Sequence, residues 1–390
     1  MELGRPEAQG PELQRLADAV ERERHPERRD RPSKVLPAST RRRWIDRTRG
    51  SVQAGCHGCF CSAPPGSCQE ASSRRRPRGI EGGVGGPFHP GEIEIQRRAG
   101  VVDQARKVGR IVASGLPTGV APFLARQRLA VAGSIDPAGR VWASLLTGPA
   151  GFLAVVDSRS LRVAARPLPG DPLADDTGAR PEIGLLVLDP RTRQRMRFNG
   201  RRLPSDEGLV LLVEQAYGNC SKYIQRRRLE LDAEPRGAPA PPRVTSTLDP
   251  AQRAAIARAD TFFIASFHPA GGADSSHRGG FPGFVRVLGP DRLAFDDYPG
   301  NTMFNTLGNL VAYPSAGLLF VDFANGDVLQ VTGRAQVRPD FGVEVHVEEV
   351  REMKDASPLR FALVEYSPSN PALSRDAPGA VSSTEPDGGG

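Results

Sequence analysis

The chain has 390 residues and a mass of 41.9 kDa, enough for two or three domains of ordinary size. Its net charge of +7 comes from the first fifth: of 52 basic and 45 acidic side chains, 17 and 10 fall within residues 1–80, which leaves 35 of each sign in the rest. The high pI therefore does not indicate a nucleic-acid-binding fold. No apolar run reaches about 18 residues, and residues 1–30 lack an apolar signal region, so we expect neither a membrane-spanning helix nor export.

Residues 1–86 have the composition of a disordered, basic arm, because few apolar residues recur at any period and burial cannot offset the entropy of ordering. The spacing of the cysteines in this arm does not match paired Cys-x2-Cys zinc modules, so we favour free thiols over a metal site. Only Cys220 lies outside the arm, which favours the reducing cytoplasm. The arm cysteines are Cys56, Cys59, Cys61 and Cys68.

An internal repeat follows the arm, and such a repeat decides the architecture of a chain. Four short segments recur, the first two at an offset of 132 residues and the others at 133: Pro137–Gly139 with Pro269–Gly271, Gly151–Phe152 with Gly283–Phe284, Gly184–Leu186 with Gly317–Leu319, and Gly200–Arg201 with Gly333–Arg334. A single one-residue shift over about 70 positions is not expected by chance. The sequence therefore predicts two copies of one module.

The first copy and the linker occupy residues 87–247. We assign the first domain to residues 87–234 and expect a helix at Val101–Val112. The basic segment Ala216–Leu231 is predicted to be a helix or a turn. Pro235–Pro242 is expected to form a linker, since prolines fix an extended backbone.

The second domain is assigned to residues 248–366, and residues 367–390 to a disordered tail. An apolar strand is predicted at Thr261–Phe267. Two hairpins are predicted around the turns Gly289–Asp291 and Asn325–Asp327. The segment Asn301–Ala312 has helical spacing of its apolar residues. The predicted fold is mainly β (α+β), with each copy a small closed barrel.

Polar residues around the predicted helix start could bind a phosphate, because a helix N-terminus presents free N–H groups and a positive dipole end. The preceding strand could add a hydroxyl and a cationic fork from Ser276 and Arg278. For His277, a place on the strand surface is favoured over ligand contact. The remaining candidates surround the predicted helix start and are Gly300, Asn301, Thr302, Asn305 and Thr306.

Arginines alternate along residues 193–202 of the first copy. Such a pattern on a strand either faces solvent or lines an anion site, and we favour the solvent-facing interpretation. The five residues are Arg193, Arg195, Arg197, Arg201 and Arg202.

These motifs together resemble the pyridoxamine 5′-phosphate oxidase-like superfamily of FMN-binding split barrels, in particular a predicted flavin-nucleotide-binding branch. The resemblance covers roughly residues 87–366. It rests on Ser275–Val285, Leu293–Asn301, Phe304–Asn309, Gly317–Asp322 and Gly333–Ala335, with Phe88–Glu92 and Tyr217–Gln225. One departure is that Thr302–Met303 stands where relatives commonly place an arginine or lysine. Arg278 or Arg286 would then have to supply the phosphate charge.

The resemblance implies FMN bound between two barrels, which relatives supply as a homodimer and this chain would supply as an intrachain pseudo-dimer. The first copy has prolines and acidic residues where the second has its helix, which opposes a phosphate there. The acidic residues are Asp171, Asp175 and Asp176. We therefore expect one flavin per chain, with Lys222, Tyr223 and Trp142 of the first copy closing the site.

The expected function is that of an FMN-binding protein, a flavin-dependent oxidoreductase that acts on an unknown small molecule in the cytoplasm. The alternative is a non-catalytic flavin-, deazaflavin- or haem-binding store or sensor. We expect no nucleic-acid or membrane partner, and either a monomer, as a pseudo-dimer, or a homodimer.

Overall fold

The structure is a computed structural model that describes residues 86–174, 180–230 and 241–372. The arm, apart from Gly86, lies outside the described residues with its cysteines, as do most of the linker and residues 373–390 of the tail. None of the helices in the described part of the chain combines the length and apolar character needed to cross a membrane.

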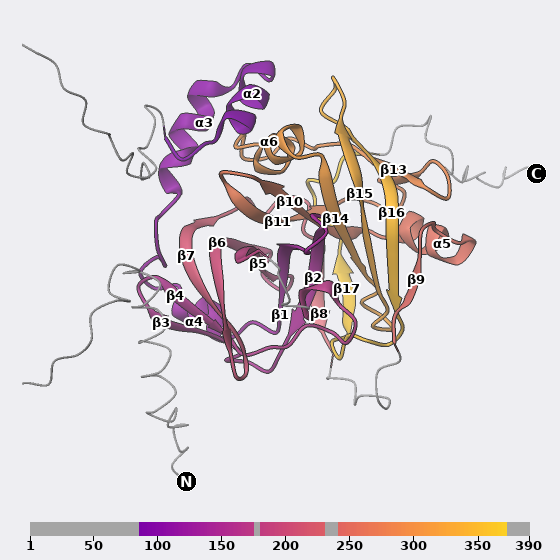
Figure 1. Cartoon of the computed structure of the whole chain (residues 1–390), viewed down its shortest axis with the longest axis horizontal. Coiled ribbons are helices and arrows are strands. Elements are labelled where there is room, and N and C mark those ends of the chain that lie inside the picture. Colours follow the sequence, from indigo (N-terminus) through magenta and orange to yellow (C-terminus); the bar gives the residue numbers. More distant parts are fainter. Residues whose placement is uncertain (1–85, 175–179, 231–240, 373–390) are drawn as a thin grey trace, which may run out of the picture. The chain divides into compact units, whose positions relative to one another are not determined.

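Two large antiparallel sheets dominate the described part of the chain, which confirms the mainly β prediction (Figure 1). The first sheet follows a group of short helices. The helices are α2 (Pro90–Arg98), α3 (Val102–Val108), η2 (Gly109–Ile111) and α4 (Ala121–Ala125). The strands are β1 (Leu129–Ile135), β2 (Val141–Thr147), β3 (Leu153–Asp157), β4 (Ser160–Val163), β5 (Glu182–Asp189), β6 (Gln194–Ser205) and β7 (Gly208–Gly218), with η3 (Pro172–Ala174) between β4 and β5.

The second sheet follows α5 (Pro250–Arg258), which begins with a capping box between Asp249 and Gln252. Its strands are β10 (Thr261–His268), β11 (Gly272–Gly279), β12 (Val285–Val287), β13 (Arg292–Phe295), β14 (Ser315–Val321), β15 (Val328–Val337) and β16 (Val343–Met353), and β9 (Arg243–Thr245) pairs with β16. Helix α6 (Asn305–Ala312) lies between β13 and β14, and a ribbon of β8 (Arg226–Leu229) and β17 (Phe361–Glu365) forms a third, small sheet.

The two large sheets have the same strand order and matching registers. The first runs β2-β1-β5-β6-β7-β4-β3 and the second β11-β10-β14-β15-β16-β13-β12. Val131 pairs with Leu145 in the first sheet, and Phe263 pairs with His277 in the second, at the predicted offset of 132. Both sheets also carry a register irregularity just before the aligned glycines Gly200 and Gly333. The sequence alignment therefore pairs residues that occupy equivalent ladder positions.

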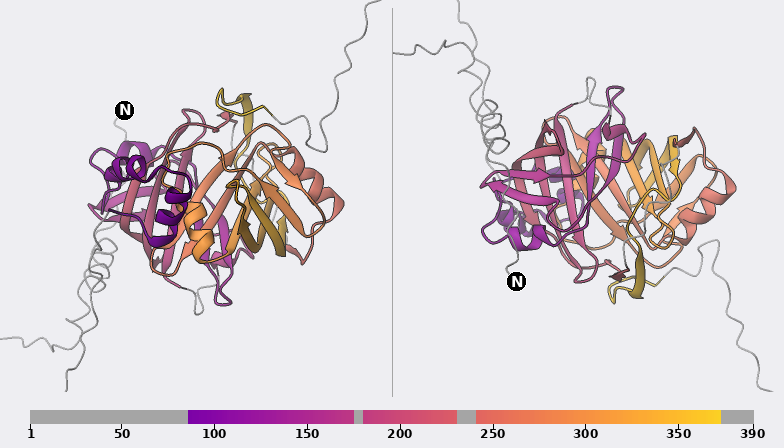
Figure 2. Two further views of the ribbon diagram at one scale, coloured as in Figure 1. Left: turned by 90° about the horizontal axis from the view of Figure 1, so that it is seen from above. Right: turned by 90° about the horizontal axis from the view of Figure 1, so that it is seen from below.

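Each large sheet packs around a core of its own, and the two sheets lie side by side (Figure 2). One cluster of buried residues joins Val131 and Leu186 of the first sheet to Phe263 and Leu319 of the second. Burial of such side chains stabilises by roughly 1.5–3 kcal/mol each. This packing brings the inward-facing residues of β6 and β11 together.

Several local predictions need correction. The predicted helix Asn301–Ala312 begins only at Asn305. Of the two alternatives for Ala216–Leu231, the turn is found and the helix is not: the described residues 216–230 complete β7, turn and then form β8. Helix α2 was not predicted. The start of the predicted tail, residues 367–372, is part of the described structure. Ser367 is buried, and its N–H donates to Gln225 (2.8 Å). The hairpins β12–β13 and β14–β15 are confirmed.

Candidate functional site

Two adjoining cavities lie where β6, β11 and the segment before α6 meet. The first, of about 60 Å³, we call the arginine cavity, and the second, of about 400 Å³, the loop cavity. The larger volume is within the range of small-molecule sites. Both cavities are lined by Arg197, Arg278, Tyr298, Gly300 and Asn301.

Most of the residues predicted from the sequence line these cavities. His277 and Tyr223 line the arginine cavity. Thr302, Asn305 and Thr306 line the loop cavity. Two predicted residues lie elsewhere. Ser276 is fully buried behind the wall, where its hydroxyl pairs with Thr306 (3.0 Å). Lys222 is exposed and lines neither cavity.

Trp142, expected on the first-copy side of the site, also lines neither cavity. It is fully buried, and its indole N–H donates to Asp136 (3.0 Å). Tyr223 does close the site from that copy. Its hydroxyl donates to the Pro299 carbonyl (2.8 Å), and its backbone has φ of 67°. A left-handed tyrosine is a strained conformation that neighbouring contacts must hold.

The segment before α6 is an irregular loop rather than the start of the helix. Thr302 and Phe304 both have left-handed backbones (φ 62° and 58°), and Phe304 caps the helix without a side-chain hydrogen bond. The prediction that Gly300 and Asn301 lie at the helix N-terminus is therefore wrong. Asn301 instead fixes the loop: its Oδ1 accepts from the Met303 N–H (3.1 Å), and its Nδ2 donates to Asn219 (2.9 Å).

Two arginines of β6 belong to the site, which the sequence analysis missed. Arg195 and Arg197 point toward the second sheet and line the arginine cavity, so the solvent-facing interpretation is wrong for them. The repeat contained the missing signal. At an offset of 133, these positions align with Val328 and Gln330, an apolar and a neutral residue that are both buried.

The arginines differ in how their charges are balanced. Arg197 is buried and lies 3.2 Å from an Asp274 carboxylate oxygen. Arg278 forms an ion pair with Asp297 (2.9 Å). Arg195 has no carboxylate within 4 Å among the described residues. Its guanidinium bonds instead to His277, through the ring Nδ1 (3.0 Å) and the backbone carbonyl (3.4 Å).

The predicted substitute Arg286 is not available to the site. Its guanidinium is held in a two-pronged ion pair with Asp296 (2.8 and 2.9 Å). Such bidentate pairs are geometrically specific and strong. The positive charge of the site therefore comes from Arg195, Arg197 and Arg278.

His277 is a neutral hydrogen-bond donor in the cavity wall. Burial lowers the pKa of its imidazole well below 6.5, and the neighbouring Arg195 and Arg278 lower it further. Since a guanidinium can only donate, Nδ1 accepts from Arg195 and Nε2 carries the proton. This Nε2 is buried and has no hydrogen-bond partner.

The unpartnered groups around the arginine cavity are predominantly donors. Buried side-chain nitrogens without partners occur on Arg195, Arg197, Arg278, His277 and Asn219. Unsatisfied buried donors are costly, and an uncompensated buried cation more so. Burial, followed by the charges of Arg197 and Arg278, lowers the pKa of Arg195 to about 9, so it stays charged at pH 7. This donor set fits a ligand that presents an anionic group with several acceptor oxygens.

The internal repeat relates the arginine cavity to a second position, on the other side of the two packed sheets, which side chains of the protein itself fill. Leu145 and Leu146 align with His277 and Arg278. Asp171, which we expected to repel a phosphate, is fully buried and accepts hydrogen bonds from Ser144 (2.6 Å) and Gln330 (2.8 Å). Burial raises its pKa to about 6. Asp175 and Asp176 lie outside the described residues.

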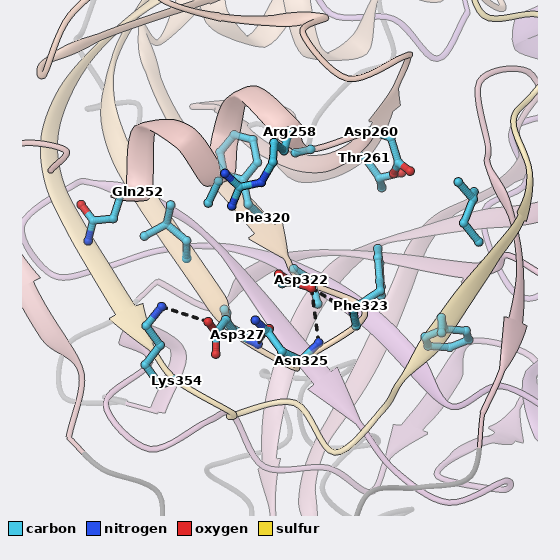
Figure 3. Close-up of a pocket in the computed structure, with 18 of the residues that line it drawn as sticks. Gln252, Arg258, Asp260, Thr261, Phe320, Asp322, Phe323, Asn325, Asp327 and Lys354 are labelled. Atoms are coloured by element: carbon cyan, nitrogen blue, oxygen red, sulfur yellow. Dashed lines mark hydrogen bonds and ion pairs between the residues drawn. The ribbon is translucent and has the colours of Figure 1, made fainter. Parts of the chain in front are cut away.

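A separate cavity of about 540 Å³ lies between α5, β15 and β17 (Figure 3). Two ion pairs join charged side chains that line it: Lys354 with Asp327 (2.9 Å), and Arg227 with Asp260. Phe320 contributes to an apolar wall. No buried donor without a partner lines it among the described residues. It therefore lacks the chemical signal that marks the arginine cavity.

Comparison with known proteins gives one informative match. Residues 248–366 match the family described as Pyridoxamine 5'-phosphate oxidase. No curated protein matches the chain. Among solved structures, a variant of HupZ from Group A Streptococcus is similar at 12% identity, over 27% of this chain and 98% of that one, with a TM-score of 0.23. MrkH, described as a c-di-GMP-dependent transcription regulatory factor, is similar at 12% identity over 70% and 82%, with a TM-score of 0.16.

Neither structural likeness bears on the function, because both TM-scores are low. The family match is different in kind, since it spans β10 to β17 and includes His277, Arg278, Gly300 and Asn301 of the site. Residues 248–366, about a third of the chain, are therefore similar to the pyridoxamine 5′-phosphate oxidase family.

Proposed function

We propose that the protein binds FMN, with its phosphate in the arginine cavity, and acts as a flavin-dependent oxidoreductase on a small molecule. The observation that carries this proposal is Arg195, a guanidinium in the cavity wall with no carboxylate partner among the described residues. A phosphate would supply the missing negative charge and accept the unpartnered N–H groups. The family match of residues 248–366 supports a flavin nucleotide as the source of that phosphate.

The chain's own residues would bind and orient the cofactor. Arg195, Arg278 and the Nε2–H of His277 can donate to a phosphate, while Asn301 keeps the loop in place. The loop cavity, of about 400 Å³, is the adjoining space for the larger part of the ligand. A bound flavin would supply the hydride or electron chemistry. The chain would act in the cytoplasm, where the exposed part of Cys220 stays reduced.

The absorption spectrum of the purified protein, with flavin measured per chain, tests this proposal. A flavin spectrum supports it, and reduction by NAD(P)H with turnover of an acceptor separates an oxidoreductase from a store. A haem spectrum, or failure of the colourless protein to bind added FMN, would reject it.

The proposal predicts one flavin per chain. The equivalent of the arginine cavity is occupied by Asp171, Ser144 and Gln330, so the described residues form no second donor set there. Asn301→Asp places a carboxylate beside the proposed phosphate and removes the donor to Asn219. We expect FMN affinity to fall by about tenfold or more, with no residual second class of sites in calorimetric titration.

Asn325→Asp is the matched control, because Asn325 lies in the exposed β14–β15 turn and lines the separate cavity. It should bind FMN as the parent does. A stoichiometry near two, or half of the sites surviving in Asn301→Asp, would contradict the single-site prediction.

A second matched pair tests whether the packing of the sheets positions the site. A Cβ on Gly184 would lie 2.5 Å from Asp274 Cα, and one on Gly317 would lie 2.6 Å from Trp142 Cα, so each glycine permits the same close approach. We expect both alanine variants to lose roughly 1–3 kcal/mol of stability by overpacking. Only Gly184→Ala should weaken FMN binding, since Asp274 holds Arg197. Equal affinity in the two variants would argue against this dependence.

A further inference from the structure

Three hydrogen-bonded side chains lead from α2 to the arginine cavity. Glu92 is 4% exposed; its Oε2 accepts from the His89 N–H (2.8 Å), and its Oε1 accepts from Asn305 Nδ2. Asn305 Oδ1 then accepts from Arg197 Nη1 (3.2 Å). The Asn305 amide is thus oriented by a carboxylate on one side and a guanidinium on the other.

The backbone around Glu92 is held against α6 by close packing. A Cβ on Gly91 would lie 2.2 Å from the Gly308 carbonyl oxygen, and one on Gly308 would lie 2.5 Å from the Glu92 nitrogen. A capping box also fixes Glu92 at the start of α2. Glu92 therefore cannot move away from Asn305 without unpacking the two helices. When Glu92 changes its protonation state, the side chains that hydrogen-bond to it have to adjust instead.

Glu92 is the group of this cluster that titrates near neutral pH. Burial raises its pKa to about 7, and the Asp274 carboxylate adds to the rise. The pKa of His89 is lowered to about 4, by burial and by the nearby His268, whose own pKa is also lowered by burial. The titratable groups that face Glu92 from the packed elements are His89 of α2, Arg197 of β6, Tyr217 of β7 and Asp274 of β11. The pKa values of Arg197 and Tyr217 are raised.

We propose that Glu92 is a positioning residue whose protonation turns the Asn305 amide and frees Arg197 to bind the anionic ligand. This inference rests on the proposed anion site. A proton taken from water onto Oε1 adds an O–H donor to Glu92, and Asn305 can supply an acceptor for it if its amide rotates. This rotation places Oδ1 toward Glu92 and turns Nδ2 toward Arg197. Two donors then face each other, so Arg197 Nη1 loses this acceptor.

Both consequences of protonation favour anion binding. Arg197 Nη1 keeps Asp274 and Tyr217 as acceptors but is no longer held by Asn305, so an anion in the cavities that Arg197 lines can take the place of that acceptor. The negative charge on Glu92 also disappears from the surroundings of the ligand. Ligand binding and proton uptake are reciprocal by linkage. The affinity for an anion should therefore rise as the pH falls from 8 to 6, by about tenfold, with net uptake of a proton.

Calorimetric titration of the whole chain with sulfate tests this coupling, because sulfate remains a dianion throughout this pH range. Titrations in two buffers of different ionisation enthalpy count the protons taken up. Glu92→Gln copies the protonated carboxyl, so it should bind with the low-pH affinity at every pH and without proton uptake. Asn305→Ala, which keeps Glu92 but removes the amide, should lose most of the pH dependence. Glu94→Gln, an exposed change on the same helix, should keep the wild-type profile.

The outcomes separate the two proposals. If the wild type binds neither sulfate nor FMN at any pH, the anion site itself is rejected, and this coupling with it. If the wild type binds sulfate but Glu92→Gln keeps the same pH profile, the coupling alone is rejected. An unchanged profile in Asn305→Ala would reject the amide rotation as its route.

Discussion

Replacing Arg195 with methionine is expected to weaken FMN binding about a hundredfold while making the ligand-free protein more stable. Loss of a charge-assisted phosphate contact costs on the order of 1.5–3 kcal/mol, and the upper end corresponds to a hundredfold in affinity. In the free protein, however, Arg195 has His277 as its hydrogen-bond partner and no carboxylate among the described residues. A partly buried cation without a counter-ion opposes folding, and methionine keeps its apolar stem.

Binding should be followed by flavin fluorescence, and stability by thermal unfolding without ligand. Arg201→Met is the matched control on the same strand, because Arg201 is exposed and lines neither cavity. It should change neither quantity appreciably. Unchanged FMN affinity in Arg195→Met would remove the main support for the proposed function. A less stable ligand-free variant would show that the contact with His277 outweighs the cost of the charge.

Glu92→Gln is expected to stabilise the ligand-free protein at pH 8 by about 3 kcal/mol and to have little effect below pH 4.5. The pKa of Glu92 is raised from 4.5 to about 7 by burial in the folded protein. Folding therefore favours the protonated form, and stability is lost as the pH rises from 4.5 through 7. A shift of this size corresponds to about 3 kcal/mol at about 1.4 kcal/mol per unit. Glutamine can keep the capping box and carries no charge.

Unfolding by urea at pH 5 and pH 8 measures the effect. The difference between Glu92→Gln and the wild type should grow with pH over this interval. Glu94→Gln should show no such growth, because its side chain is exposed. A difference that is constant with pH would mean that Glu92 is ionised throughout and does not act as the titrating group of the α2–α6 cluster.

The sequence predicted the features of the fold that depend on short segments. The turn Gly289–Asp291 specifies a hairpin by its own residues, and the register of β12 and β13 follows from it. The start of α6 was wrong because Thr302 and Phe304 adopt left-handed backbones that no local pattern in these residues indicates. Contacts from distant segments, such as Asn219 to Asn301, hold that loop in place.

The arginines of β6 show a different limit. The alternation of residue types along a strand indicates which side chains share a face of the sheet, but it does not indicate what covers that face. We placed Arg195 and Arg197 in solvent, whereas a second sheet covers them and Asp274 accepts the charge of Arg197. Only comparison between the two halves of the chain carried that information, since Gln330 occupies the position equivalent to Arg197. Arg278 and Asn301 were identified because the family motif includes them.

The two large sheets have matching registers but are formed by different parts of one sequence. A single substitution therefore changes one sheet and leaves its equivalent in the other sheet unchanged. In a symmetric dimer of one sheet, every change to a site would appear in both copies at once. Here His277 and Arg278 could be kept while the positions now occupied by Leu145 and Leu146 changed freely. The buried contact between Asp171 and Gln330 now joins the two sheets at that place. A chain of this design can use one of its two equivalent positions to bind a ligand and the other for contacts that stabilise the fold.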